Sequence, residues 1–443
     1  MKKIYVQDIK EKIALGTSVM LFGWARNKRD HGSIVFIDVC DSTGSIQAIV
    51  DKGKVSDEIY GIAKNIIPES SMRVVGNLQV DDFLGHNARS IEVQIIDIIG
   101  EASYNLIMPR PRSDFDVFDP LIADHLLRNR HLYIRNENLV AVLRFRHSLM
   151  GMLHQWFRTK NFVEITAPIL TPLPLYDDHT ALSLNLGEEK IFLTQCVAFY
   201  LESALPAFEK VYNIGPSFRG EESRSKRHLM EYWHVKAEIA FADLEDIISC
   251  VEEMLRDVIS ECKEKCGNEM KILGVNLPES ALSVPYPRIS YREAMSTLKT
   301  RGIDFELGKS LSSKEEAVLA SQFETPFWIT NLPRNIEPFP YVIDASDPST
   351  TKTADLIAPG EFGELLGVAE KITNPLELQQ RLEEKGKGSD VRYKWYCELR
   401  RYGCVPHSGF GMGVERVIRW LLKLSHVRDT IPFPRIFRRK VYP

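Results

Sequence analysis

The sequence predicts an α+β protein, in which a small N-terminal β-barrel precedes an antiparallel sheet flanked by helices. Three observations indicate this class. Residues 18–100 hold short segments of alternating polar and apolar residues separated by turns, as in a barrel of short strands. A segment with three prolines and no helical period follows. Beyond it, strand patterns joined by hairpins or short links stand among amphipathic helical patterns, which favours an antiparallel sheet.

The chain divides into two domains. Its 443 residues are too many for one hydrophobic core. We predict a barrel domain at residues 1–102, a hinge at 103–127, where the prolines gather, and a larger domain at 128–443.

Five strand-like segments build the predicted barrel, at residues 19–30, 33–41, 44–51, 71–80 and 90–100. A helix-like stretch, Val55 to Ile66, lies between the third and fourth segments. This order favours a Greek-key barrel of the OB type, and another small β-barrel is the alternative.

The larger domain opens with a long amphipathic helical pattern, Arg128 to Phe157. Further helices are predicted at 243–265 and 291–298, and an irregular segment at 266–285. Strands are predicted at 162–165, 191–194, 210–219, 231–240, 327–331 and 354–370, and a closing strand and helix at 403–424.

Composition favours a soluble globular protein, with 44% hydrophobic and 26% charged residues. We find no apolar run of the roughly 18 residues that a membrane span needs and no signal-peptide pattern at the N-terminus, so we expect a cytoplasmic protein. The seven cysteines are scattered, which favours reduced thiols over disulfides or metal ligands. The net charge of −4 leaves only local basic surfaces for nucleic acid, near Arg26 and Arg29 and at the C-terminus; both could equally be solvated faces.

Two distant blocks, Phe218 to Trp233 and Gly409 to Trp420, together predict an ATP site. The Arg219 guanidinium can grip a phosphate as a charged fork, and Glu221 can accept a hydrogen bond from an adenine amine. Tyr232 offers a stacking face, and Arg416 offers a cation to lie over the same ring. Gly409, Gly411 and Gly413 alternate, which would leave one strand face bare where a flat ring could approach the backbone.

These blocks resemble motifs 2 and 3 of the class II aminoacyl-tRNA synthetases, in the subclass that activates aspartate, asparagine and lysine. The resemblance rests on Arg219 with Glu221, the Arg227, His228 and Leu229 triplet, and the GxGxER pattern at 411–416. Trp156 to Pro168 looks like motif 1, which implies a homodimer. The barrel resembles the anticodon-binding domain of this subclass, so the resemblance covers nearly the whole chain.

The resemblance implies ATP as a substrate and assigns parts of its site. Arg219 would hold the α-phosphate and Arg416 the γ-phosphate, with Arg227 and His228 assisting at the β- and γ-phosphates. Tyr232 would stack on adenine, and Leu229 and Gly413 belong to the same motifs. Glu364 matches the magnesium-binding glutamate. Asp355 is a second candidate ligand for Mg²⁺, and a capping or solvated role for it stays open.

The resemblance also implies that the barrel binds a tRNA anticodon. Phe36 and Gln47 match the positions that stack on and read the central base, a uracil, and Arg26 and Arg29 supply positive charge beside them. The alternative is a core Phe and a surface Gln.

Several stretches are similar to the asparagine-specific members of the subclass, so asparagine is the expected substrate. The expected pocket consists of Asp178, Gln195, Ala198, Gly367 and Lys371, with Asp177 as an alternative to Asp178. Here the chain departs from the family pattern: Ala198 replaces a glutamine, and Lys371 replaces an arginine, which at a bidentate site is not conservative.

Three functions therefore remain open from the sequence. The first is an asparagine-specific synthetase with a variant pocket. The second is a paralogue that adenylates another carboxylic acid and passes it to tRNA or another acceptor. The third is a non-catalytic RNA-binding protein.

Overall fold

The computed structural model describes residues 3–80, 88–103, 115–174, 178–221 and 225–442. The chain forms two compact units, Met1–Phe115 and Asp116–Pro443. Much of the predicted hinge, residues 104–114, lies outside the described residues. The predicted linker segment also contains helical turns, at Pro120–Ile122 and in α3 (Ala123–Arg128). We see no helix in the described parts that is long and apolar enough to cross a membrane.

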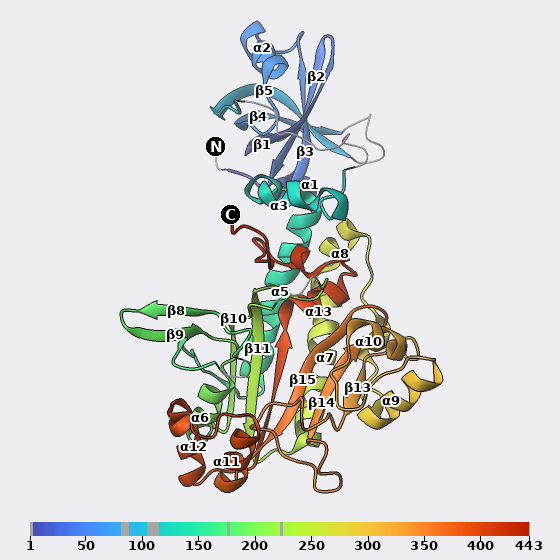
Figure 1. Ribbon diagram of the computed structural model, residues 1–443. Coiled ribbons are helices and arrows are strands. Elements are labelled where there is room, and N and C mark those ends of the chain that lie inside the picture. The colour runs from blue at the N-terminus through green and yellow to red at the C-terminus, as the bar shows by residue number, and fades with distance from the viewer. Residues whose placement is uncertain (1–2, 81–87, 104–114, 175–177, 222–224, 443) are drawn as a thin grey trace. The chain divides into compact units, whose positions relative to one another are not determined.

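The N-terminal unit is a closed barrel with strand order β1-β2-β3-β5-β4 (Figure 1). All five predicted strands are confirmed: β1 (Ser18–His31), β2 (Ile34–Asp41), β3 (Gly44–Asp51), β4 (Ser71–Val80) and β5 (Arg89–Gly100). Alternate residues of β2 are buried, as the sequence pattern requires. The predicted helix is α2 (Asp57–Asn65), and Ser56 caps it by accepting a hydrogen bond from the amide of Ile59. A short helix, α1 (Val6–Glu11), was not predicted.

The second unit is built on an eight-stranded sheet with the order β12-β13-β14-β15-β16-β11-β10-β6. Its central pairings are antiparallel as predicted, but both edge pairings, β12 with β13 and β10 with β6, are parallel. The strands are β6 (Val163–Glu164), β10 (Lys210–Phe218), β11 (Glu231–Ala240), β12 (Arg288–Ser290), β13 (Phe327–Thr330), β14 (Thr353–Ala358), β15 (Gly363–Lys371) and β16 (His407–Gly413).

A separate three-stranded sheet holds β7 (Leu170–Thr171), β8 (Ser183–Leu186) and β9 (Glu189–Leu193). The strand predicted at 191–194 therefore belongs to this sheet and not to the main one. The helices of the unit, besides α3, are α4 (Arg130–Tyr133), α5 (Glu137–Thr159), α6 (Ala198–Phe208), α7 (Leu244–Lys265), α8 (Gly267–Leu273), α9 (Tyr291–Thr300), α10 (Ser313–Ala320), α11 (Pro375–Glu384), α12 (Lys394–Glu398) and α13 (Val414–Leu421). The sequence predicts an irregular segment at 266–285. That prediction is wrong for residues 267–273, which form α8.

One face of the main sheet is apolar and packs on helices. Val235, Val368 and Met412 point into a core that α5, α7 and α13 complete, and α5 and α7 run along the same side of the sheet (Figure 1). Because neighbours along a strand point to opposite faces, the residues between these positions lie on the other face. The polar and glycine positions of the two sequence blocks fall there.

Candidate functional site

The open face of the main sheet gathers the candidate residues from four adjacent strands. Directly paired residues of antiparallel strands point to the same face, and the register pairs Asp355 with Gly367, Gly367 with Gly411, and Gly411 with Lys236. One line of positions therefore crosses β14, β15, β16 and β11. The same register adds, on either side of this line, Tyr232, His234, Glu238, Ala369, Lys371, His407, Gly409 and Gly413.

A β-bulge brings Glu364 onto this face. Strict alternation along β15 would turn Glu364 away from Gly367, because the two are three residues apart. The pairing between β14 and β15 shifts between Leu356 and Ile357, so that Leu356 pairs with Leu366 and Ile357 pairs with Glu364. The extra residue, Leu365, is absorbed in the bulge, and Glu364 points to the same side as Gly367.

Arg219, Glu221 and Tyr232 form one end of the site. Arg219 follows β10, and its Nη1 lies 3.4 Å from Oε1 of Glu221. The Tyr232 phenol, followed by the Glu221 and Glu364 carboxylates, raises the pKa of Arg219. The Arg219 side chain retains 36% exposure, so a cation that stays charged is open to a ligand. The structure thus brings together three of the predicted ATP residues.

Arg416 and Glu364 meet beside them. Arg416, on α13, places Nη1 3.0 Å from Oε2 of Glu364 and donates to its carbonyl oxygen at 3.2 Å. Burial opposes ionisation of Glu364, but Arg416 prevails and lowers its pKa. The Gly413 backbone precedes this helix, and a Cβ at Gly413 would lie 3.5 Å from Arg416. Gly413 and Arg416 are therefore immediate neighbours, as the sequence block predicts.

Asp355 and Glu364 are the candidate pair for a divalent cation. Burial, followed by repulsion from Glu364, raises the pKa of Asp355 well above its usual value, which is the response expected of two carboxylates that share a site. Mg²⁺ prefers hard oxygen ligands and is often held by one or two carboxylates plus phosphates and water. A pair of carboxylates therefore fits a cation that a ligand's phosphates help to bind; the described residues contain no trio of His, Cys, Asp or Glu arranged to hold a metal.

Arg227 is held by a residue that the sequence did not reveal. Its guanidinium makes a two-point contact with Glu316 of α10, and both side chains are more than nine-tenths buried. Glu316 also accepts a hydrogen bond from the amide of Glu364 at 3.0 Å. Glu316 thus ties the segment after β10 to the bulged strand β15.

His228 and Leu229 have different surroundings. His228 Nε2 lies 3.7 Å from Oε2 of Glu221. Burial and then the charge of Arg416 lower the pKa of His228 to about 4, so it is neutral at physiological pH. Leu229 is buried in a small cluster with Val427 and Ile431, and it anchors the segment without facing the open site.

At two of its three positions, the glycine alternation has a different role from the one that the sequence predicts. A Cβ at Gly409 would lie 2.2 Å from the Glu238 carboxylate, and one at Gly411 would lie 2.1 Å from Nζ of Lys236. Side chains of β11 therefore occupy this space, and the prediction of a bare face for a flat ring is wrong at Gly409 and Gly411. Only Gly413 remains next to the proposed nucleotide end.

The other end of the face carries buried charges. Lys371 Nζ lies 3.6 Å from Oε1 of Glu238, and both side chains are almost fully buried. Lys371 also stands 4.5 Å from the centre of the Tyr341 ring. Burial opposes its charge, but Glu238 and then Tyr341 raise its pKa. Glu238 Oε2 has no hydrogen-bond partner among the described residues.

The remaining predicted pocket residues divide into two groups. Gln195 is buried, with Nε2 3.0 Å from Oγ1 of Thr180. The preceding residue, Thr194, accepts a hydrogen bond from the amide of Phe218 at 2.8 Å, so Gln195 lies close to the end of the face that carries Arg219. Ala198 and Asp178 make their contacts elsewhere.

Ala198 is buried in an apolar cluster with Leu173 and Phe199, and it contributes to the core. Asp178 pairs with Lys387 at 2.6 Å and remains half exposed. Asp177 lies outside the described residues. Gly367 has no room for a side chain, since a Cβ there would lie 2.8 Å from Oδ1 of Asp355.

Behind Glu238, Glu202 of α6 organises a cluster that sequence reasoning missed. It receives hydrogen bonds from Tyr396 and Arg400, both at 2.7 Å, and lies 3.2 Å from His407 Nε2. Burial alone would lower the pKa of His407, but Cys404 and Glu202 raise it to about 10. His407 therefore carries a positive charge at neutral pH.

On the barrel, three of the four predicted anticodon residues share one outer surface. Arg29 pairs with Phe36 and Asp38 pairs with Gln47 across the strands. The Arg29 guanidinium lies 5.6 Å from the Phe36 ring centre and contacts the Gln47 amide oxygen. Phe36 is therefore not a core residue, whereas Gln47 is mostly covered, with 4% exposure. Arg26 pairs with Glu69 instead.

Comparisons with known proteins find relatives for both units of the chain. Residues 123–436 match the model of the tRNA synthetases class II (D, K and N), and residues 19–99 match the OB-fold nucleic acid binding domain. The chain is 36% identical to the asparagine--tRNA ligase of Desulforamulus reducens over 96% of both chains, and 35% identical to that of Pyrococcus abyssi over the full length of both. A crystal structure of asparaginyl-tRNA synthetase from Pyrococcus horikoshii with asparaginyl-adenylate is similar, with a TM-score of 0.93 and 34% identity over all of both chains.

Proposed function

The chain belongs to the class II tRNA synthetases of the D, K and N group, and from this premise we propose that it activates asparagine with ATP and transfers it to the 3′ end of tRNA. In the first step the amino-acid carboxylate attacks the α-phosphorus of ATP, and pyrophosphate leaves. In the second step the terminal ribose hydroxyl of tRNA attacks the acyl carbon of the adenylate, and AMP leaves.

One observation carries the proposal: Arg219, Tyr232, Arg416 and Glu364 meet at one end of the open face. The barrier to activation comes largely from a carboxylate approaching a polyphosphate, and fixed cations lower it. Arg219 has its charge secured by its neighbours and keeps an exposed face, which suits a grip on the α-phosphate. Arg416 suits a contact with the γ-phosphate beneath adenine, and Tyr232 suits stacking on that ring.

The Asp355 and Glu364 pair is the proposed site for Mg²⁺, which would neutralise phosphate charge in the bound nucleotide. Glu364 stays ionised because Arg416 lowers its pKa. Asp355 shares the site with it from the neighbouring strand. The two-point contact between Arg227 and Glu316 keeps the bulge that presents Glu364 in place. Arg227 itself is largely engaged by Glu316, so we assign the β- and γ-phosphates to His228 and Arg416.

A second substrate class is favoured by the charges at the other end. Three cationic groups, Lys371, Arg400 and protonated His407, gather around the two carboxylates Glu202 and Glu238, and Lys236, whose pKa burial lowers, stands beside them. This excess of positive charge would suit an acid with a carboxylate side chain. A dicarboxylic amino acid is therefore the alternative substrate.

The barrel surface around Arg29 and Phe36 supports tRNA as the acceptor, because a partly exposed ring beside a cation is suited to stacking on a base. A protein that only binds RNA would have no use for the cations and carboxylates gathered on the second unit. A homodimer and a cytoplasmic location are parts of the same proposal, and light scattering at twice the chain mass tests the dimer.

The decisive experiment is ATP/pyrophosphate exchange measured with asparagine, aspartate and other acids in turn, followed by tRNA charging. Asparagine-dependent exchange and charging support the proposal. Exchange with aspartate or another acid, and none with asparagine, would identify that acid as the substrate. No exchange with any acid would refute the proposal that the protein activates an acid. Arg219→Ala should abolish exchange without unfolding the chain, whereas Arg401→Ala, an exposed arginine outside the site, should leave exchange unchanged.

A further inference from the structure

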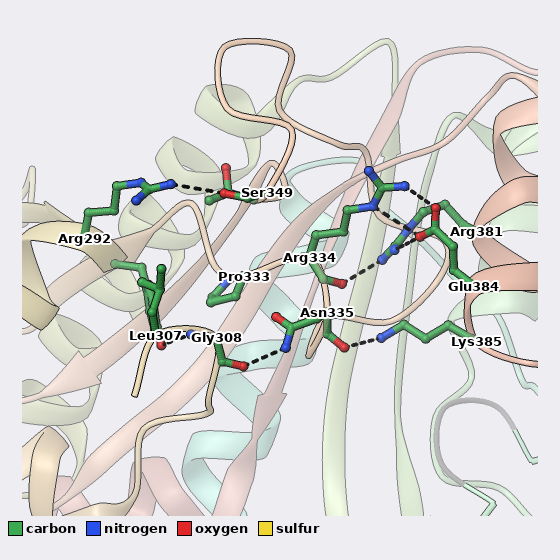
Figure 2. Close-up of a pocket in the computed structure, with 12 residues that line it drawn as sticks. Arg292, Leu307, Gly308, Pro333, Arg334, Asn335, Ser349, Arg381, Glu384 and Lys385 are labelled. Carbon is green, nitrogen blue, oxygen red and sulfur yellow. Dashed lines mark hydrogen bonds and ion pairs between the residues drawn. The ribbon is translucent and has the colours of Figure 1, made fainter. Parts of the chain in front are cut away.

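A cavity of about 510 Å³ lies apart from the open face of the sheet. It is formed by α9, by the segments around Gly308, Pro333 and Ser349, and by the end of α11 (Figure 2). Its volume lies within the range of small-molecule sites in proteins. None of the residues proposed for ATP, the acid or the metal lines it, so it is a separate feature of the second unit.

Positive charge dominates the lining. Arg292, Arg334, Arg381 and Lys385 contribute cations, and Glu384 contributes the single carboxylate. Figure 2 shows Arg334 and Arg381 reaching the same Glu384 carboxylate, so two guanidinium groups share one negative charge. This arrangement leaves a net positive charge inside the cavity.

Arg381 is the buried centre of this group. Its side chain is 1% exposed, and its Nη2 donates to the carbonyl oxygens of Arg334, Glu337 and Pro338. Its Nε has no acceptor among the described residues. Burial followed by the charge of Arg381 lowers the pKa of Lys385, and burial raises that of nearby Glu337 to about 7. Among the described residues, Glu384 is the only carboxylate that pairs with Arg381, and Arg334 shares it.

The rim supplies further donors. Arg292 is more than half exposed; it pairs with Asp347, which lies outside the lining, and donates to Ser349 Oγ at 3.1 Å. Lys385 Nζ donates only to the carbonyl of Asn335, at 2.7 Å, among the described residues. Asn335, Ser349 and Thr350 add neutral polar groups, and Leu307 and Pro333 add an apolar wall. Cations that converge from α9 and α11 can surround an anion from two sides.

We propose that this cavity binds a phosphorylated small molecule of about nucleotide size. Arg292 and Lys385 would contact its phosphoryl oxygens at the rim, above the guanidinium pair of Arg334 and Arg381. Leu307 and Pro333 would cover its less polar part. This site goes beyond the proposed aminoacylation, because it is separate from the site for ATP.

The test is isothermal titration of the full chain with inorganic tripolyphosphate at physiological ionic strength. The ATP site also attracts this anion, so the Arg219→Ala variant serves as the background that removes its contribution. Saturable binding in that background is expected. Adding Arg292→Gln and Lys385→Gln should weaken it by about tenfold or more, since each removes a charged hydrogen-bond donor. Lys314→Gln, which removes an exposed charge on α10 outside the cavity, should change it less than about twofold.

A second variant guards against a loss that comes from misfolding. Leu307→Glu keeps every cation and places a carboxylate in the wall of the cavity, at a side chain that is 60% exposed, and it should weaken binding to a similar extent at an unchanged melting temperature. The proposal is overturned if Arg219→Ala alone abolishes binding, if the rim variants bind as tightly as their background, or if Lys314→Gln weakens binding equally. Citrate binding as tight as that of tripolyphosphate overturns the phosphoryl assignment.

Discussion

Replacing Gly409 with alanine should disturb the acid end of the site selectively. The new Cβ would lie 2.2 Å from the Glu238 carboxylate, whereas carbon atoms in contact lie about 3.5–4.0 Å apart. The carboxylate must therefore move by more than about 1 Å. It has almost no free space, because Glu238 is 1% exposed, and moving it away from Lys371 strains a contact of 3.6 Å.

The size of the effect follows from two terms. Overpacking a filled site typically costs about 1–3 kcal/mol, and a buried charge that loses its partner costs about 3–5 kcal/mol. We expect a loss of stability of about 2–4 kcal/mol between these limits. We also expect the KM for the amino acid to rise by about tenfold or more, since about 1.4 kcal/mol of lost binding energy corresponds to a factor of ten.

Gly413→Ala is the matched control on the same strand. Neither glycine has a positive φ, so alanine adds no backbone strain at either position. The nearest atom to the new Cβ at Gly413 is 3.5 Å away, on Arg416, which is an ordinary contact. This variant should keep its stability and the KM for the amino acid, and raise the KM for ATP.

The assay is ATP/pyrophosphate exchange with each substrate varied in turn, together with urea unfolding. The reasoning is refuted if Gly409→Ala keeps wild-type stability and an unchanged KM for the amino acid. It is also refuted if both variants raise the same KM, because the two ends of the face would then not be separate.

Three further predictions address other contacts. Glu316→Gln should destabilise the second unit by about 3–5 kcal/mol, because it leaves Arg227 buried without its anion; urea unfolding against wild type measures this, and a change below about 1 kcal/mol would contradict it. Folding raises the pKa of His407 from 6.5 to about 10, so its contribution to stability is complete below pH 6.5 and declines as the pH rises toward 10. The difference in unfolding free energy between wild type and His407→Gln should shrink over that interval, and a constant difference would show that His407 is not charged in the fold. Phe36→Ala should weaken tRNA binding by about 1–3 kcal/mol, measured by filter binding, while ATP/pyrophosphate exchange stays unchanged; equal tRNA affinity would exclude Phe36 as a stacking residue.

Local patterns made much of the fold predictable. The five barrel segments are short, rich in β-branched and other apolar residues and bounded by turn residues, and this pattern indicates strands. The main antiparallel hairpin, β10 and β11, was predictable for the same reason. Edge strands such as β12 have three residues, too few for any period to appear.

The parts of the site that depend on distant contacts were not predictable from residue patterns. Glu316 lies 89 residues from Arg227, and nothing in the sequence of α10 distinguishes it from a solvated glutamate. Glu202 presents the same difficulty, because its partners Arg400 and His407 follow about 200 residues later. The resemblance to a family located Glu364, but alternation alone would have placed it on the wrong face, since the bulge at Leu365 leaves no clear mark in the sequence.

The arrangement of the face explains how one half of the site can depart from the family pattern while the other keeps it. Glu364 and Lys371 stand at opposite ends of β15, seven residues and roughly 20 Å apart. Glu364 is stabilised by Arg416 and by the Arg227–Glu316 contact, whereas Lys371 is stabilised by Glu238 and Tyr341. The two sets share no residue, so a lysine in place of an arginine at position 371 can be accommodated by Glu238 without moving the carboxylates proposed to serve ATP. Substrate choice and adenylate chemistry can therefore change independently in this protein.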